Sequence, residues 1–233
     1  MAIDISFKDA WIGMADCKHC PSRDFSLFAS LPDQDLEHTR APVNKYKFKH
    51  GSVIYRADEK GHELYTLRTG LLKLERYLPD GNQRIVRLVR PNDLFGLEVL
   101  VKPAYQHDAV VLEDAEICRI PAEVIQRLSD KNPELHKEIM VRWQNALSEA
   151  DDWLTELLSG SARQRVARLI LKLVDDEGNC SLLSREDMGA TLSVTTETTS
   201  RIIAEFKRQD IIRELRHNYF HCDTDTLRDI AEA

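Results

Sequence analysis

The spacing of apolar residues changes along the chain near Pro121, and this change limits the fold more than any other feature. Between residues 45 and 120, glycines and prolines separate short runs in which apolar and polar residues alternate. Alternation with period two between frequent turn residues is typical of antiparallel β-sheets. After Pro121 the apolar residues recur every three or four positions, which is typical of amphipathic helices. We therefore expect an α+β protein with a β domain first and a helical part second.

The helical part begins with a long segment from Pro133 to about Ser159, which has no internal glycine or proline. A helix of roughly 25 residues is about 38 Å long. Its apolar stripe can pack on its own domain and can also pair with a second copy of the chain as a coiled coil, and we expect a homodimer. The stripe consists of Leu135, Ile139, Trp143, Ala146, Ala150, Trp153, Leu154 and Leu157.

After Gly160-Ser161 the pattern predicts a second domain, in which two short helices are joined by a tight turn. Ser184 and Thr195 are good N-caps, because a serine or threonine oxygen can accept a hydrogen bond from a backbone N–H of the first helical turn. The two helices are therefore expected over residues 185–192 and 196–209. Two short helices joined in this way form a helix-turn-helix.

The second helix of such a unit enters the major groove of DNA, with its first turns against the base edges. Arginine can bond guanine in a bidentate manner, and glutamate can accept from the N4 amino group of cytosine. The candidate contacts lie on one face at the start of this helix and are Thr196, Glu197, Ser200 and Arg201. The candidate phosphate contacts are Lys207, Arg208, Arg213 and Arg216, the last in an expected hairpin wing. The alternative is that Glu197 and Arg201 only form an ion pair on an exposed helix.

Composition limits the class of protein further. The chain has 233 residues, of which 42% are hydrophobic and 30% are charged, and its net charge is −7. These values indicate a globular chain of one or two domains. No apolar run reaches the length of a membrane span, and the first ten residues lack the pattern of a signal peptide, so a cytoplasmic protein is expected. No nucleophile–base arrangement or glycine-rich phosphate loop is evident, so an enzyme is not expected.

The whole chain resembles the CRP/FNR family of bacterial transcription regulators. The most specific match is Glu197-Thr198-Thr199-Ser200-Arg201, which is similar to the E-x-x-S-R pattern of the FNR branch. The resemblance implies that Glu197 and Arg201 read a G·C pair in half-sites of the TTGAT type, and that Ser200 sets the preference at an outer base pair. It also implies that RNA polymerase is a partner. Ser193 departs from the usual glycine of the turn, and Thr199 replaces a usual apolar residue, but neither change removes a base-contacting group.

The resemblance implies four parts of the chain. Residues 1–30 form an N-terminal segment with the sensor cysteines, and residues 31–132 form an effector domain, a β-roll like those that bind cyclic nucleotides. Residues 133–159 form the dimerisation helix, and residues 160–233 form the winged helix-turn-helix that binds DNA.

Cyclic AMP is not expected as the effector. Family members that bind it hold its phosphate with a Gly-Glu pair and, about ten residues later, an Arg-Ser pair. In this chain Leu97 takes the place of the glutamate, and His107 and Asp108 take the places of the arginine and serine. A carboxylate repels a phosphate.

The five cysteines do not indicate a disulfide framework, because their number is odd and the expected compartment is reducing. FNR-type regulators bind a [4Fe–4S] cluster through three N-terminal cysteines and a distant one. Cys17 and Cys20 resemble the first two of these ligands, and Cys118 resembles the distant one. The third position falls on Ser26, which is a poor iron ligand.

Three interpretations of these cysteines remain open. Asp24, His19 or an exogenous ligand completes a cluster; or Cys17 and Cys20 form a dithiol switch that oxidation closes; or a haem, or another ligand of the β-roll, senses a signal such as nitric oxide. Cys180 and Cys222 lie in the DNA-binding domain, and they are expected to be ordinary residues.

Overall fold

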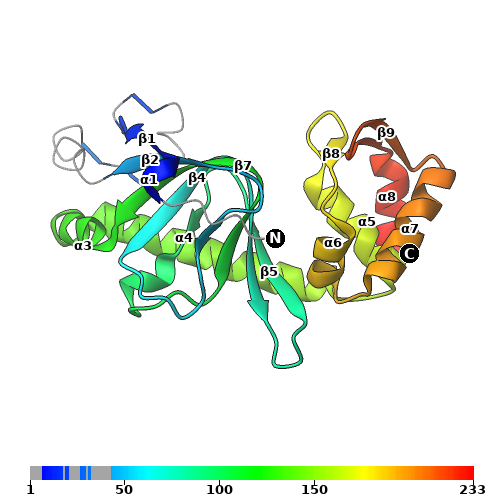
Figure 1. Ribbon diagram of the computed structural model, residues 1–233, viewed down its shortest axis with the longest axis horizontal. Coiled ribbons are helices and arrows are strands. Elements are labelled where there is room, and N and C mark those ends of the chain that lie inside the picture. The colour runs from blue at the N-terminus through cyan, green and yellow to red at the C-terminus, as the bar shows by residue number, and fades with distance from the viewer. Residues whose placement is uncertain (1–6, 18, 21–26, 30, 33–42) are drawn as a thin grey trace. The chain divides into compact units, whose positions relative to one another are not determined.

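The computed structural model describes residues 7–17, 19–20, 27–29, 31–32 and 43–233 (Figure 1). Asp24 and Ser26, which the cluster interpretation involves, lie outside these residues. The chain divides into two compact units, one made of residues 1–76 and 86–147 and the other of residues 77–85 and 148–233. The predicted α+β class is confirmed, and the four-part division stays a prediction. In the described part of the chain, no helix is both long enough and apolar enough to cross a membrane.

The first unit is built around a seven-stranded sheet with the strand order β1-β2-β7-β4-β5, in which β3 also pairs with β7 and β6 with β4. Its long central strands β4 and β7 pair antiparallel, as the period-two alternation predicts. A short helix, α1 (Phe7–Ala10), precedes the sheet. The strands are β1 (Trp11–Met14), β2 (Asn44–Phe48), β3 (Val53–Tyr55), β4 (Glu63–Tyr77), β5 (Gln83–Val89), β6 (Leu94–Phe95) and β7 (Asp108–Pro121).

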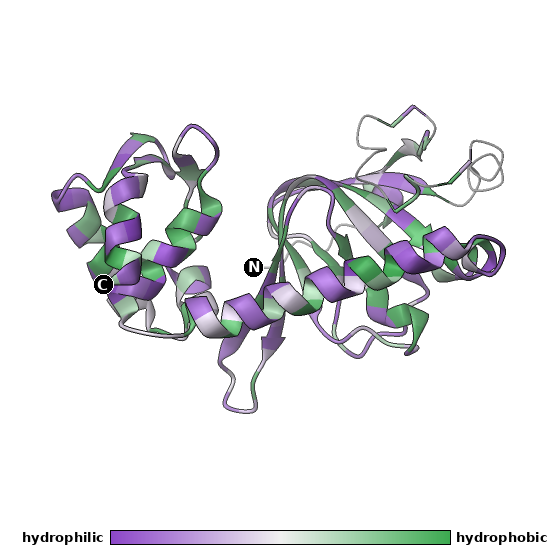
Figure 2. Ribbon diagram, turned by 180° about the vertical axis from the view of Figure 1, so that it is seen from behind, coloured by the Kyte–Doolittle hydropathy of each residue, from purple (hydrophilic) through white to green (hydrophobic). Residues whose placement is uncertain are grey.

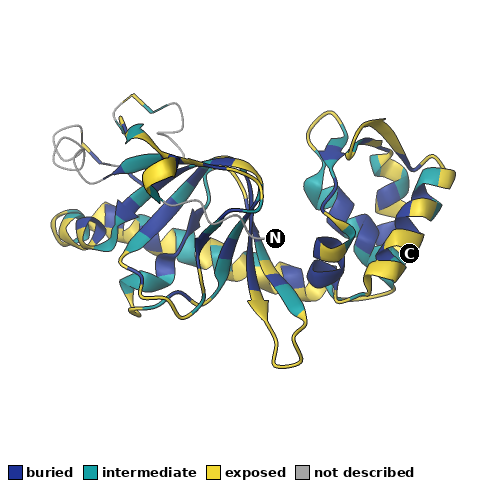
Figure 3. Cartoon of the chain, in the orientation of Figure 1, coloured by how far each residue is buried: buried dark blue, intermediate teal, exposed yellow. Residues whose placement is uncertain are grey.

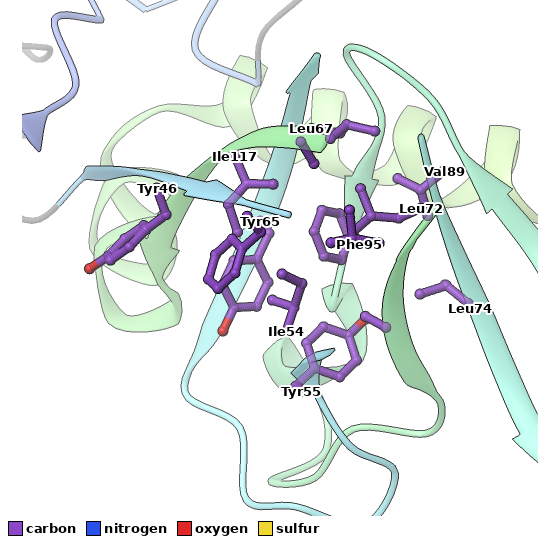
Figure 4. Packing of buried hydrophobic residues seen from close by; sticks show 14 of the residues in the cluster. Tyr46, Ile54, Tyr55, Tyr65, Leu67, Leu72, Leu74, Val89, Phe95 and Ile117 are labelled. Atoms are coloured by element: carbon purple, nitrogen blue, oxygen red, sulfur yellow. The ribbon is translucent and has the colours of Figure 1, made fainter. Parts of the chain in front are cut away.

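Aromatic rings fill the interior of this sheet (Figure 4). Tyr55 stacks on Tyr105 with ring centroids 3.8 Å apart, and Tyr65 stacks on Phe95 at 5.2 Å. A Cβ atom at Gly61 would lie 2.7 Å from the ring of Tyr105, so only glycine leaves room for this packing. The chain's own side chains therefore fill the interior of the first unit, at the high packing density that is usual for proteins.

The long helical segment predicted for residues 133–159 is present with one irregularity. A helix, α3 (Ala122–Lys131), leads into α4 (Pro133–Asp152), and the π-helical turn η3 (Trp153–Leu157) continues from α4. In this last stretch the hydroxyl of Thr155 donates to the carbonyl of Asp151 at 2.9 Å, and the hydroxyl of Ser159 donates to the carbonyl of Thr155. Hydroxyls bonded to carbonyls four residues earlier are associated with bent helices, so the regular helix is shorter than predicted.

Figure 2 shows hydrophobic and hydrophilic residues alternating along the long helical segment. Its apolar residues divide into buried and exposed sets. Leu135, Ile139, Trp153 and Leu157 are buried, as expected for a stripe that packs on its own domain. A further set has no cover in the structure: Met140 is 53% exposed, Val141 43%, Leu147 56% and Leu154 63%. Leu154 belongs to the predicted apolar stripe and lies in its exposed set.

The second unit contains helices that pack around a small three-stranded sheet with the order β8-β10-β9. The predicted helix-turn-helix and hairpin wing are both present. The elements are α5 (Ala162–Leu173), β8 (Asn179–Ser181), α6 (Arg185–Leu192), α7 (Thr196–Arg208), β9 (Ile212–Arg216), β10 (Tyr219–Cys222) and α8 (Thr224–Glu232).

Arg168 of α5 joins three segments of the second unit. Its Nη1 atom donates to the carbonyl oxygens of Glu156 and Ser159 at 2.7 and 2.9 Å. Its Nε and Nη2 atoms both donate to the carbonyl of Ala231 in α8, at 3.0 and 2.6 Å. Carbonyls at the end of a helix lack intrahelical partners, and a guanidinium can satisfy several of them at once. The end of the long helical segment is thereby tied to the last helix of the chain.

Candidate DNA interface and cysteine cavity

The turn between α6 and α7 depends on two residues without large side chains. A Cβ atom at Gly189 would lie 2.7 Å from the carbonyl oxygen of Val194, and Val194 N donates to the carbonyl of Gly189 at 3.1 Å. Ser193 ends α6 with φ 56° and ψ 43°, the left-handed conformation that glycine adopts most readily. The backbone here reverses tightly enough to bring the start of α7 against α6.

The start of α7 is set by its cap. The Thr195 side chain accepts a hydrogen bond from Thr198 N at 3.1 Å, as predicted. One face of the helix is buried, with Thr199, Ile202, Ile203 and Phe206. Figure 3 shows how exposed and buried stretches alternate along α7. Thr196, Glu197, Ser200 and Arg201 are all exposed.

The alternative interpretation of Glu197 and Arg201 as an ion pair is not supported by the geometry. Both residues lie among those that the structure describes, and no ion pair joins them there. Two charged and two hydroxyl side chains therefore project from one end of the helix with their polar atoms available to a ligand. Their role in base recognition remains a prediction.

Thr199 shows how the fold accommodates a hydroxyl where an apolar side chain is usual. It is fully buried, and its Oγ1 donates to the carbonyl of Thr195 at 3.2 Å. A buried hydroxyl with a partner costs little, so the departure does not disturb α7.

Cationic side chains lie around the predicted contact face. Lys207 pairs with Glu214 of β9 at 2.7 Å, and Arg163 of α5 pairs with Glu205 at 3.0 Å. The guanidinium of Arg216 lies 4.6 Å from the ring centre of Tyr219 in the wing. Among the candidate phosphate contacts, Lys207 is thus engaged by a carboxylate, whereas Arg208 and Arg213 are exposed.

A second candidate site is a cavity of about 150 Å³ in the first unit. It brings together Cys17, Cys20 and Cys118, the three cysteines that the sequence singled out. Cys118 lies in β7 between Lys45 of β2 and Thr66 of β4, so strand pairing fixes its position at the cavity wall. The remaining lining residues are Ala15, Asp16, His19, Leu27, Phe28, Val43, Lys45, Thr66, Leu67, Arg68, Asn92 and Ile120.

Arg68 of β4 is the cation that contacts a thiol of this cavity, and the sequence analysis missed it. Its Nη1 donates a hydrogen bond to the Sγ of Cys20. Burial raises the pKa of the Cys118 thiol to about 11, although the nearby Arg68 charge opposes the effect. Arg68 and Cys20 are 48 positions apart, so no motif or spacing in the sequence predicts that they meet.

The described side chains of this cavity do not fit a four-thiolate iron–sulfur cluster. Only three thiols line the cavity, and one of them accepts a hydrogen bond from a guanidinium. In the described ranges, no three histidine, cysteine or acidic side chains are placed to hold a metal ion. The predicted fourth ligand, Asp24, lies outside those ranges.

The two segments that correspond to a phosphate-binding site are engaged within the protein. Leu97 is buried, and Glu98 accepts a hydrogen bond from Gln106 N at 3.1 Å. Asp108 accepts from Ala57 N at 2.7 Å. Burial lowers the pKa of His107, so the neutral imidazole is favoured. A phosphate in this place would meet the Asp108 carboxylate and the neutral ring of His107. That cyclic AMP is not the effector stays a prediction.

A β-roll unit followed by a winged helix-turn-helix defines a DNA-binding transcription regulator. The sequence model named "Cyclic nucleotide-binding domain" matches residues 45–132, and the one named "Crp-like helix-turn-helix domain" matches residues 164–230. The chain belongs to the CRP/FNR family of transcription regulators. The expectation of a regulator rather than an enzyme is confirmed.

Individual relatives agree with this assignment. The fumarate and nitrate reduction regulatory protein of Vibrio cholerae is 24% identical over 205 residues, which cover 84% of this chain and 82% of that protein. The electron transport regulator A of Shewanella oneidensis is 26% identical over 205 residues, covering 84% and 80%. Among solved structures, FixK2 from Bradyrhizobium japonicum has a TM-score of 0.74 at 23% identity, over 82% of this chain and 98% of FixK2.

Proposed function

We propose that this regulator binds TTGAT-type palindromes as a homodimer, under the control of a redox signal at the cysteine cavity. One observation carries the recognition part of the proposal. Thr196, Glu197, Ser200 and Arg201 share the exposed face at the start of α7, while the opposite face is buried. The first turns of the second helix are the part of a helix-turn-helix that meets base edges.

Binding to a palindrome with two TTGAT half-sites tests the recognition assignment. Arg201→Ala removes the bidentate donor to guanine and should cost about 1–3 kcal/mol, a loss of roughly 5- to 150-fold in affinity. The matched control is Arg208→Ala on the same helix, which should weaken specific and non-specific DNA alike and lower the salt slope by about one. If the Arg201→Ala variant protects the palindrome in a footprinting experiment as well as the unaltered protein does, the recognition assignment is wrong.

The exposed apolar set on the long helical segment supports the homodimer. Met140, Leu147 and Leu154 are spaced seven residues apart, which is the spacing that pairs helices as a coiled coil. Two copies paired through this set would present two recognition helices to half-sites one helical turn apart. Sedimentation equilibrium of Leu147→Glu should give a monomer that binds palindromic DNA weakly, whereas Asn145→Glu should remain a dimer. A Leu147→Glu dimer of undiminished stability would contradict the pairing.

The cysteine cavity supports the redox part of the proposal, since it gathers three thiols from two distant segments beside one guanidinium. Oxidation of the Cys17 and Cys20 thiols to a disulfide releases two protons and transfers two electrons to an oxidant, such as a low-molecular-weight disulfide. A disulfide has no acidic hydrogen and binds a guanidinium less well than a thiolate does, so this step would release Arg68. The redox signal can change DNA affinity only if the redox state of the cysteines and the DNA both favour the same state of the dimer.

An iron–sulfur cluster with three thiolates and a fourth ligand other than a described thiol is a second candidate, favoured by the presence of Cys118 in the same cavity as the Cys17–Cys20 pair. Protein purified without oxygen distinguishes the chemistries. Iron together with acid-labile sulfide in the purified protein would support a cluster instead of the dithiol. A Soret band in the absorption spectrum would indicate haem. A colourless, iron-free protein that loses DNA binding on oxidation and regains it with a reductant supports the dithiol. We also propose that the DNA-bound dimer contacts RNA polymerase at the promoter.

A further inference from the structure

Two buried cysteines of the second unit lie against each other in the small sheet that carries the wing. Cys180 lies in β8 and Cys222 ends β10, and their Sγ atoms are 3.5 Å apart. The side chains are 3% and 2% exposed. Strand pairing holds them there, because Phe220 lies opposite Cys180 and Cys222 N donates to the carbonyl of Gly178 at 2.8 Å.

We propose that Cys180 and Cys222 are a peroxide-reactive pair that closes to a reversible intrachain disulfide within the DNA-binding domain. This redox site is separate from the cysteine cavity of the first unit, and it does not depend on the chemistry proposed there. Disulfide sulfurs are about 2.05 Å apart, so the two Sγ atoms need to approach by roughly 1.5 Å. Side-chain rotation and a small shift of the short edge strand β8 can supply this movement.

A surface pocket of about 580 Å³ lies against one of the two cysteine residues. Cys222 lines this pocket and Cys180 does not, so Cys222 is the cysteine closer to an oxidant in the pocket. The lining includes Asp175, Asp176, Glu177 and Asp223, together with Arg228. This acidic lining disfavours anionic oxidants such as glutathione disulfide, whereas neutral hydrogen peroxide enters without an electrostatic penalty.

The two sulfurs have different surroundings. Contact with Cys180 lowers the pKa of the Cys222 thiol, against the opposing effects of burial and of Asp175. The same contact raises the pKa of Cys180. Because the thiolate is the nucleophile towards peroxide and Cys222 is the cysteine that lines the pocket, Cys222 is the attacking sulfur and Cys180 is the resolving one.

The oxidation then proceeds in two balanced steps. The Cys222 thiolate attacks one oxygen of hydrogen peroxide, the O–O bond breaks, and hydroxide leaves to take up the released proton as water. The Cys180 sulfur next attacks the resulting sulfenic sulfur, the S–O bond breaks, and a second water leaves as the S–S bond forms. Two thiols and one peroxide thus give one disulfide and two waters, and a dithiol reductant reverses the result by exchange.

Peptide mapping of the full-length protein tests this proposal directly. After limited hydrogen peroxide and alkylation of the remaining thiols, trypsin should release residues 173–185 joined to residues 217–228. Dithiothreitol added before alkylation should remove this linked peptide. The oxidised protein should also unfold at a higher temperature than the reduced protein, because the bond constrains the unfolded chain.

Two variants separate the roles of the sulfurs. Cys180→Ala should leave Cys222 as a sulfenic acid that dimedone traps, and Cys222→Ala should leave Cys180 unmodified at the same peroxide dose. Alanine fits both buried positions, and a cooperative thermal transition of each variant establishes that it folds. The proposal is overturned if Cys180 and Cys222 stay reduced while Cys17 and Cys20 oxidise, or if Cys222 in the unaltered chain accumulates as sulfinic acid without linkage.

Discussion

Arg68 donates a hydrogen bond to the thiol of Cys20, 48 residues earlier in the chain, from a strand that also pairs with the strand of Cys118. A guanidinium held by a sheet thereby meets a sulfur from the N-terminal segment. The positive charge of Arg68 also opposes the rise that burial causes in the pKa of the Cys118 thiol.

The stability of the protein should fall at alkaline pH because of Cys118. Its pKa in the folded chain is about 11, whereas an unfolded cysteine ionises near 8.5. The stabilisation is fully present below the unfolded value and is lost as the pH rises towards the folded one, by about 3 kcal/mol. Urea unfolding between pH 8 and pH 11 measures the loss. Cys118→Ala should show a smaller decline, and a difference between the two proteins that does not change with pH would contradict the assignment.

Replacing Ser193 by glycine should stabilise the DNA-binding domain. Ser193 has φ 56°, where a side chain other than that of glycine is strained. Relief of this strain should add about 1 kcal/mol to the free energy of unfolding. Urea denaturation of Ser193→Gly measures the gain, and Ser193→Ala, which keeps the strain, serves as the control. Equal stability of the two variants would count against the strain.

Gly189→Ala should destabilise the helix-turn-helix. The added Cβ would lie 2.7 Å from the carbonyl oxygen of Val194, a backbone atom that cannot rotate away. Overpacking of this kind costs about 1–3 kcal/mol, and DNA affinity should fall because the turn positions α7. Glu186→Ala, at an exposed position of α6, should change stability by less than about 0.5 kcal/mol. Thermal melts and DNA titrations of both variants measure these effects. A Gly189→Ala variant as stable as Glu186→Ala would contradict the prediction.

Arg168→Lys should loosen the connection between the long helical segment and α8. Lysine keeps the charge, but its single ammonium cannot reach the carbonyls of both Glu156 and Ala231, which Arg168 bonds at 2.7 and 2.6 Å. Leaving such carbonyls unpaired costs about 1–3 kcal/mol. Hydrogen exchange should show earlier opening at residues 228–233 in the variant than in the unaltered protein. Unchanged protection there would rule out this role for Arg168.

Cyclic AMP should not bind the β-roll. Asp108 occupies the phosphate side with a hydrogen bond to Ala57 N at 2.7 Å, and stacked tyrosines fill the interior. Isothermal titration calorimetry with cyclic AMP up to the millimolar range should give no saturable heat. A saturable signal that vanishes in the presence of cyclic GMP would show a nucleotide site and would contradict this expectation.

The local signals of the sequence were reliable wherever neighbours along the chain decide the structure. Ser184 and Thr195 predicted the starts of α6 and α7, because a cap bonds to the backbone within one turn. The long helical segment was less well predicted. Its regular part ends at Asp152, since hydroxyl side chains compete for the backbone bonds beyond it.

The sequence by itself determined the class of this protein, through the order of its periodicities, its caps and the spacing of Glu197 and Arg201 on one helix turn. Tertiary structure alone decided which sulfurs meet. Arg68 came to donate a hydrogen bond to Cys20, and Cys180 came to lie beside Cys222, 42 residues away. The physical reason is that strand pairing joins residues far apart in the chain, and their separation along the sequence carries no record of that contact.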